Sequence, residues 1–196
     1  MHVYLDTEFT GFDRRRADLL SVAVLAEDDR LFYGEFADAD WARASAWVRE
    51  HIPPLLGPPS WMDAQTTYVR ADRAGLRQRL VAWLHELGEA ELVWWTDAGA
   101  YDWVYTLDWL ADEHAGNAYA WAQAQGLRMA YQPRDLTERL PLTVGRQALA
   151  RHLLATSPIA EADPAARATA AIIGGDTAHA AWADAVVLRF LQRRLA

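Results

Sequence analysis

The sequence predicts an α/β fold in which a mixed β-sheet is flanked by α-helices within a single domain. Apolar runs of strand length alternate with segments whose apolar residues recur at helical spacing. The first three apolar runs follow one another through short turns, which indicates a β-meander ahead of the helices. With 196 residues, 52% of them hydrophobic, the chain is large enough to bury one sizeable core.

The chain is expected to open with three strands, at residues 2 to 6, Leu19 to Asp28 and Arg30 to Phe36. The apolar pattern of these runs predicts strands. An acidic turn at Asp28 and Asp29 would join the second strand to the third.

A helix is expected next, between Asp38 and His51, with Asp38 or Asp40 as its cap and prolines 53 and 54 ending it. Its apolar face would carry Trp41, Ala44, Trp47 and Val48. Most of the ten tryptophans are assigned to the core on this kind of pattern.

The remaining pattern alternates helices with two strands. The expected elements are a helix from Ala71 to Leu87, a buried strand from Glu91 to Thr96, a helix over residues 100 to 112, a strand from Leu127 to Tyr131, a helix from Asp135 to Ala155 and a final helix from Asp176 to Leu195. Asp176 or Thr177 would cap the final helix.

Composition excludes several classes of protein. With no cysteine, disulfides, Cys-ligated zinc and thiol nucleophiles are absent, so any metal would be held by carboxylates and imidazoles. No apolar run has transmembrane length and the N-terminus lacks a secretory signal pattern, which predicts a cytoplasmic protein without membrane contact. The net charge of −8 argues against a broad basic surface that coats nucleic acid, but not against a cleft that holds a few nucleotides.

The first candidate site residues are Asp6 and Glu8, in "YLDTEFTGF". Residues two apart in a strand point to the same face, so the two carboxylates would project together. Clusters of carboxylate oxygens bind hard cations such as Mg²⁺. The alternative is a solvated pair at the end of a strand in a chain with 27 acidic residues.

The second candidate is Asp102, in the first turn of a helix that follows the buried strand "LVWWT". An acid at this position lies near the carboxyl ends of the strands, which is the edge of the sheet where open α/β folds bind their ligands. The alternative is an acid that complements the helix dipole.

The third candidate is the pair His179 and Asp184, in "HAAWAD". Five helical steps separate the two side chains by roughly 140°, so they would not ligate one ion from a single helix face. The alternative is a histidine in the capping region and an aspartate paired with Arg189.

Together, "DTEFTG", "YDWVYTL" and "HAAWAD" resemble the three motifs of the DEDDh family of 3′-5′ exonucleases, which have an RNase H-like fold. Along most of the chain, the order of predicted strands and helices is also similar to that of this family's fold. Within this family, "DTEF", "AWVREHIPPLLGPP" and "GAYDWV" are most similar to the small bacterial exoribonuclease group that contains RNase AS. Phe9 is a departure, because many family members carry Thr there.

The resemblance implies phosphodiester hydrolysis assisted by two divalent ions, Mg²⁺ or Mn²⁺. Asp6, Glu8, Asp102 and Asp184 would be the metal ligands. His179 would be the general base, since an imidazole titrates near neutral pH. Phe9, Thr10, Gly11 and Phe12 would hold the terminal nucleotide, with core packing as the alternative for the two phenylalanines.

The implied activity is a 3′-5′ exoribonuclease that acts on single-stranded 3′ ends, with an adenosine preference and a homodimeric state carried over from relatives. A 3′-5′ DNA exonuclease of the proofreading or repair type is the alternative within this class. A non-catalytic RNase H-like binding or assembly module is the alternative from another class. The arginine run "DRRR", Asp13 to Arg16, is expected either to touch phosphates or to form a solvated loop.

Overall fold

The fold is that of a computed structural model, which describes residues 1–58, 64–88, 90–96, 98–111, 117–130, 132–136, 149–150 and 180–195. A six-stranded mixed sheet lies at its centre, in the order β4-β3-β2-β1-β5-β6. The strands are β1 (His2–Phe9), β2 (Leu19–Ala26), β3 (Leu31–Phe36), β4 (Thr66–Ala71), β5 (Val93–Thr96) and β6 (Arg134–Asp135).

The first three strands form an antiparallel meander at the centre of the sheet. Parallel strands extend it on both sides, with β4 beside β3 and with β5 and β6 beyond β1. β1 therefore has a neighbour on each side, and its main chain is fixed along most of its length.

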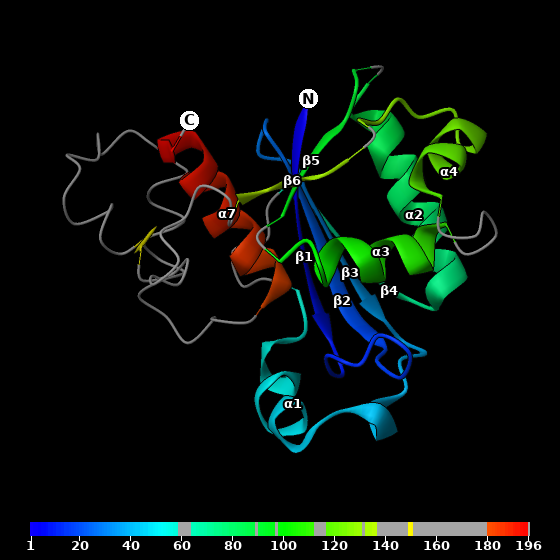
Figure 1. Cartoon of the computed structure of the whole chain (residues 1–196), viewed down its shortest axis with the longest axis vertical. Helices are drawn as coiled ribbons and strands as arrows, with labels where there is room; N and C mark the ends of the chain where they lie inside the picture. The colour runs from blue at the N-terminus through cyan, green and yellow to red at the C-terminus, as the bar shows by residue number, and fades with distance from the viewer. Residues whose placement is uncertain are drawn as a thin grey trace.

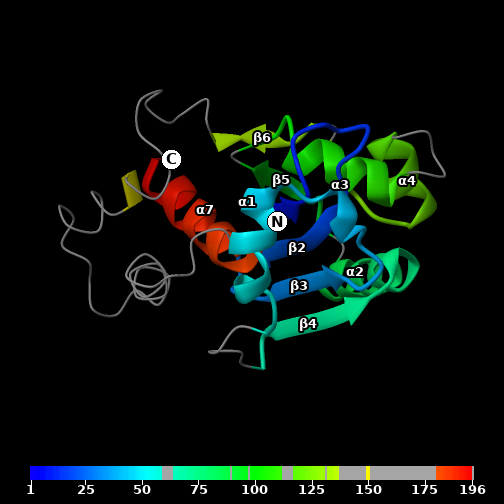
Figure 2. The ribbon, with the colours of Figure 1, turned by 90° about the horizontal axis from the view of Figure 1, so that it is seen from below.

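Helices cover both faces of this sheet (Figures 1 and 2). One face carries α2 (Arg73–Glu86), α3 (Asp102–Leu110) and α4 (Ala118–Ala124), and the other carries α7 (Ala181–Leu195). Successive side chains of β1 point to opposite faces of the sheet and so contribute to the core on each face. Val3 and Leu5 pack into the core under α2 and α3, whereas Tyr4 packs into the core under α7. The α/β class and the mixed, helix-flanked sheet are thereby confirmed, and the arrangement is consistent with an RNase H-like fold.

A smaller unit lies past the carboxyl end of β1 (Figure 1). It consists of two 3₁₀ turns, η1 (Trp41–Arg43) and η2 (Pro53–Leu55), on either side of α1 (Ala46–His51). Val48 and Ile52 pack on Leu20 of β2, and the Ser45 N–H donates to the Thr10 carbonyl at 3.1 Å. The unit is therefore attached to the loop that follows β1.

The prediction of one helix between Asp38 and His51 was wrong. Asp40 caps only the short turn η1, and the chain then becomes extended at Ala44, where ψ is 138°. The Ser45 hydroxyl accepts from the Val48 N–H at 3.2 Å and starts α1 as a separate helix.

Other parts of the predicted order of elements also need correction. The sequence pattern gave no sign of strand β4, which precedes α2, or of helix α4. In place of the strand predicted at Leu127 to Tyr131, the structure has one bridge between Met129 and Leu92, and the paired strand β6 lies further along. The helix predicted from Asp135 begins inside β6, and most of its length lies outside the described residues, as do the proposed caps Asp176 and Thr177.

Candidate functional site

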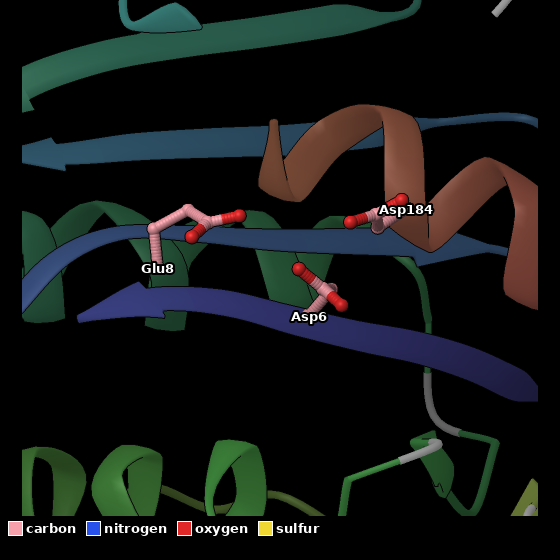
Figure 3. Close-up of side chains that lie close together, drawn as sticks. All are labelled: Asp6, Glu8 and Asp184. Carbon is pink, nitrogen blue, oxygen red and sulfur yellow. The ribbon is translucent and has the colours of Figure 1, made fainter. Parts of the chain in front are cut away.

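Three carboxylates meet between β1 and α7 (Figure 3). Asp6 and Glu8 project from β1, and Asp184 projects toward them from α7. One oxygen from each lies within 4.8 Å of the oxygens of the other two. Asp6 and Asp184 are buried and Glu8 is half-buried. This group is called the acid cluster below.

The local sequence explains how β1 supplies two of these acids. β1 continues to Phe9, beyond its predicted end, so Asp6 and Glu8 both lie within regular strand. Their side chains point to the face covered by α7, as the two-residue period predicts. Pairing with β2 shifts register between Glu8 and Phe9, so this alternation ends directly after Glu8.

The start of α7 explains how the third acid reaches them. Small buried alanines let the helix lie close to the sheet: Ala180, Ala181, Ala183 and Ala185. Asp184 occupies the first turn of α7, where the helix dipole favours a carboxylate. Arg189, considered above as its partner, forms an ion pair with Asp29.

Asp102 lies outside the acid cluster and reaches β1 from the other face of the sheet. It is the first residue of α3 and is buried. Its Oδ1 accepts from the Thr7 hydroxyl at 2.7 Å and from the Thr7 N–H at 3.2 Å. Its Oδ2 accepts from the Thr96 hydroxyl at 3.1 Å. The structure thus holds Asp102 by threonine donors from two adjacent strands.

Asp102 nevertheless shares a cleft of about 420 Å³ with two acids of the acid cluster, because Asp6, Glu8 and Asp102 all line it. Phe9, Gly11 and Phe12, which the sequence suggests as contacts for the terminal nucleotide, line it too. Thr10 differs from them because its side chain is fully buried, where its hydroxyl accepts from the Asp18 N–H at 2.7 Å.

Aromatic rings form one wall of this cleft. The Phe12 ring lies 5.5 Å from Phe9 and 5.1 Å from Tyr101, edge-on to both, and Phe9 stacks on Tyr101 at 6.0 Å. Phe12 is 74% exposed, so its ring is not a core residue. Below them, the Tyr105 hydroxyl donates to the Gly11 carbonyl at 3.0 Å, and burial raises the pKa of Tyr105, which keeps this donor protonated.

Two residues that line the cleft were missed by sequence reasoning. Trp47 was assigned to an apolar helix face, yet it is 47% exposed and stacks on His51 at 4.6 Å. Tyr101 is 38% exposed beside the cleft. Its position directly before Asp102 was the available signal, because residues adjacent to a site acid are placed near it by the main chain.

His179 lies outside the described residues, so the structure does not place the remaining candidate. None of the described helices combines the length and the apolar character that a transmembrane span requires.

The fold and the acid cluster together define an α/β protein with a candidate cation site at the end of its first strand. No family model matches the chain. Over 102 residues the chain is 35% identical to two curated proteins from Mycobacterium tuberculosis, each named as a 3′-5′ exoribonuclease. One is from strain CDC 1551 / Oshkosh and the other from strain ATCC 25618 / H37Rv. The match covers 52% of this chain and 56% of each relative, so the chain spans about half the length of the relatives it matches.

Proposed function

We propose that this protein is a metal-dependent 3′-5′ exoribonuclease that removes nucleotides from the 3′ ends of single-stranded RNA. The observation that carries the proposal is the convergence of Asp6, Glu8 and Asp184 from opposite ends of the chain. Similarity to two proteins named as 3′-5′ exoribonucleases supports the same reaction class.

The donor set fits divalent cations. Carboxylates whose oxygens lie within 4.8 Å of one another repel, and hard cations such as Mg²⁺ or Mn²⁺ prefer such oxygen ligands. Asp6, Glu8 and Asp184 would hold the ions. We include Asp102 as a further ligand, direct or through water, because it lines the same cleft as Asp6 and Glu8. When bound, two such ions would stabilise the attacking and leaving oxygens.

The reaction that we propose is hydrolysis of the last phosphodiester bond. His179 would take a proton from the attacking water, whose oxygen forms the new bond to phosphorus. The bond between phosphorus and the 3′ oxygen of the preceding nucleotide then breaks, and this oxygen takes a proton from solvent to become a 3′ hydroxyl. The products are a nucleoside 5′-monophosphate and an RNA shortened by one nucleotide.

The aromatic wall would hold the terminal base. Phe9 and Phe12, together with Tyr101 and Trp47, offer exposed or half-buried rings beside the acid cluster. Base stacking on such rings needs no basic charge, which suits a chain of net charge −8. We propose the main chain at Thr10 and Gly11 as the neighbouring contact. Adenosine preference, a homodimeric state and a cytoplasmic location remain predictions.

The test is release of mononucleotides from labelled single-stranded RNA and DNA of each base, with Mg²⁺, with Mn²⁺ and with chelator. We expect metal-dependent release of nucleoside 5′-monophosphates from RNA, fastest from oligoadenylate. Preference for DNA would support the proofreading or repair alternative. Absence of hydrolysis on every substrate would reject the enzyme and favour a non-catalytic module.

Asp6→Asn is the matching variant, because it keeps the shape of the side chain and removes its charge. We expect hydrolysis to fall by at least about a thousandfold while the circular dichroism spectrum is unchanged. Asp108→Asn is the control, since Asp108 is an exposed carboxylate outside the acid cluster. Normal turnover by Asp6→Asn would show that this carboxylate does not hold the ions.

A further inference from the structure

A second hollow adjoins the cleft at the acid cluster. It has a volume of about 330 Å³ and shares Gly11, Phe12 and Ser45 with that cleft. Arg16 and Arg43 line it, and neither lines the first cleft. The two hollows therefore adjoin at Phe12, with Asp6 and Glu8 lining one and two arginines lining the other.

The charges of this second hollow differ in sign from those of the acid cluster. Arg16 is exposed, and the described part of the chain gives its guanidinium no ion pair. Arg43 pairs with Asp40, its Nε lying 3.0 Å from Asp40 Oδ2, and its side chain is 51% exposed. One acid, Asp13, lies on the same rim.

Arg14, which belongs to the same run as Arg16, forms an ion pair outside the second hollow. Its Nε and Nη2 donate to both oxygens of Asp108, at 2.8 and 2.7 Å. The bidentate pair satisfies its charge away from the hollow. Within the run from Asp13 to Arg16, Arg14 is thus engaged outside the second hollow, whereas Arg16 lines it.

The two arginines of the second hollow come from segments that are tied to each other. The Asp18 N–H donates to the Thr10 hydroxyl at 2.7 Å, and the Asp18 Oδ2 accepts from the Asp40 N–H at 2.7 Å. These bonds join the loop that carries Arg16 to the turn η1 that carries Arg43. The backbone segments that carry the two arginines are therefore held together before any ligand binds, which lowers the entropy cost of binding.

We propose that the hollow between Arg16 and Arg43, called the arginine groove below, binds phosphates of single-stranded RNA upstream of the terminal nucleotide. This inference rests on the proposed function, because the terminal nucleotide would occupy the aromatic cleft and the rest of the RNA must leave it. Guanidinium groups recognise phosphate oxygens through paired donors. A chain of net charge −8 needs such a local positive surface to hold a polyanion.

Salt-dependent binding of a fluorescently labelled oligoadenylate tests the groove. Binding is followed by anisotropy with chelator present, so that no RNA is consumed. We expect Arg16→Ala and Arg43→Ala each to weaken binding about fivefold at low salt. The slope of log affinity against log salt should fall in magnitude by about 0.7 for each lost phosphate contact.

Arg15→Ala is the matched control, because Arg15 belongs to the same exposed run but lines neither hollow. Its affinity and salt slope should equal those of the wild type. Arg16→Lys should keep the slope, since it keeps the charge. Equal losses in Arg15→Ala and Arg16→Ala would overturn the groove in favour of diffuse attraction, and unchanged slopes in both groove variants would overturn it as well.

Hydrolysis separates this inference from the proposed function. In the groove variants, the ratio of kcat/KM on a long oligoadenylate to kcat/KM on a dinucleotide should fall about fivefold. An equal loss on both substrates would place the arginines at the terminal nucleotide and overturn the inference. If the wild type binds oligoadenylate with the predicted slopes but releases no mononucleotides, the groove stands and the exonuclease proposal fails. If the wild type binds no RNA, the groove fails.

Discussion

Thr7 lies between two acids of the acid cluster, yet its side chain serves the opposite face of the sheet. Its hydroxyl and its N–H both donate to Asp102 Oδ1, at 2.7 and 3.2 Å. Asp6 and Glu8 point toward α7 instead, because alternate residues of a strand face opposite sides. One short stretch of β1 therefore positions acids on both of its faces.

Thr7→Val should destabilise the fold by removing the hydroxyl donor from a buried carboxylate. A lost hydrogen bond to a charged group costs about 1.5 to 3 kcal/mol. Valine has nearly the same shape, so packing changes little. Urea denaturation followed by circular dichroism would measure the free energy of unfolding. We also expect slower metal-dependent hydrolysis, because Asp102 would be less firmly held.

Thr7→Ser is the control for this prediction, since it keeps the hydroxyl and loses only a methyl group. Its free energy of unfolding should stay much closer to that of the wild type than the valine variant does. If Thr7→Val and Thr7→Ser lost the same stability, the methyl group and not the hydrogen bond to Asp102 would account for the effect.

The sequence nominated Asp102 as a candidate site residue but did not reveal its hydrogen-bond partners. Its position after a buried strand placed it at the right edge of the sheet. The hydroxyl donors come from Thr7 and Thr96, and only strand pairing brings β1 and β5 together. That information is absent from the local pattern around Asp102.

At the scale of elements, the strand that was missed has a physical explanation. β4 lies at the edge of the sheet, and five of its six residues are half-buried while the other one, Arg70, is exposed. Such a strand shows neither an apolar run nor a clear alternation, which are the signals used to detect strands. The central strands β2 and β3 are buried throughout and were predicted close to their observed bounds.

The contact between β3 and α2 gives a prediction at this scale. A methyl group added at Gly34 would lie 3.0 Å from Leu76 Cδ2 and 3.0 Å from Phe32 Cε1. Both neighbours are fully buried. Gly34→Ala should therefore overpack this layer and lower the free energy of unfolding by about 1 to 3 kcal/mol, measured in urea.

Gly11→Ala is the matched control, because an added methyl group there meets no atom within 4 Å. Its stability should stay within about 0.5 kcal/mol of the wild type. Equal stability of Gly34→Ala and the wild type would mean that α2 moves away from β3 without cost, which would contradict the tight packing at this contact.

At the scale of the whole molecule, the acid cluster joins the first strand to the last helix. Asp6 and Asp184 are far apart in sequence and lie together only in the folded chain (Figure 3). The sequence predicted that Asp6 and Glu8 share a face, because a strand has a fixed period. It could not derive the approach of α7 from spacing, since that depends on how the helix packs on the sheet. The resemblance to a nuclease family supplied that expectation.

A cation bound between β1 and α7 should stabilise the entire fold. The three carboxylates converge only in the folded chain, so Mg²⁺ or Mn²⁺ would bind that state and shift the unfolding equilibrium by mass action. At a free metal concentration one hundred times the Kd, the gain is about 2.7 kcal/mol. We expect the thermal unfolding midpoint to rise with added metal and to return with chelator.

In Asp184→Asn the rise should be largely lost, whereas Asp108→Asn, which changes an exposed acid outside the acid cluster, should keep it. A full metal-dependent rise in Asp184→Asn would mean that the ions bind elsewhere, because removing one of three converging carboxylates must weaken a site that they form together.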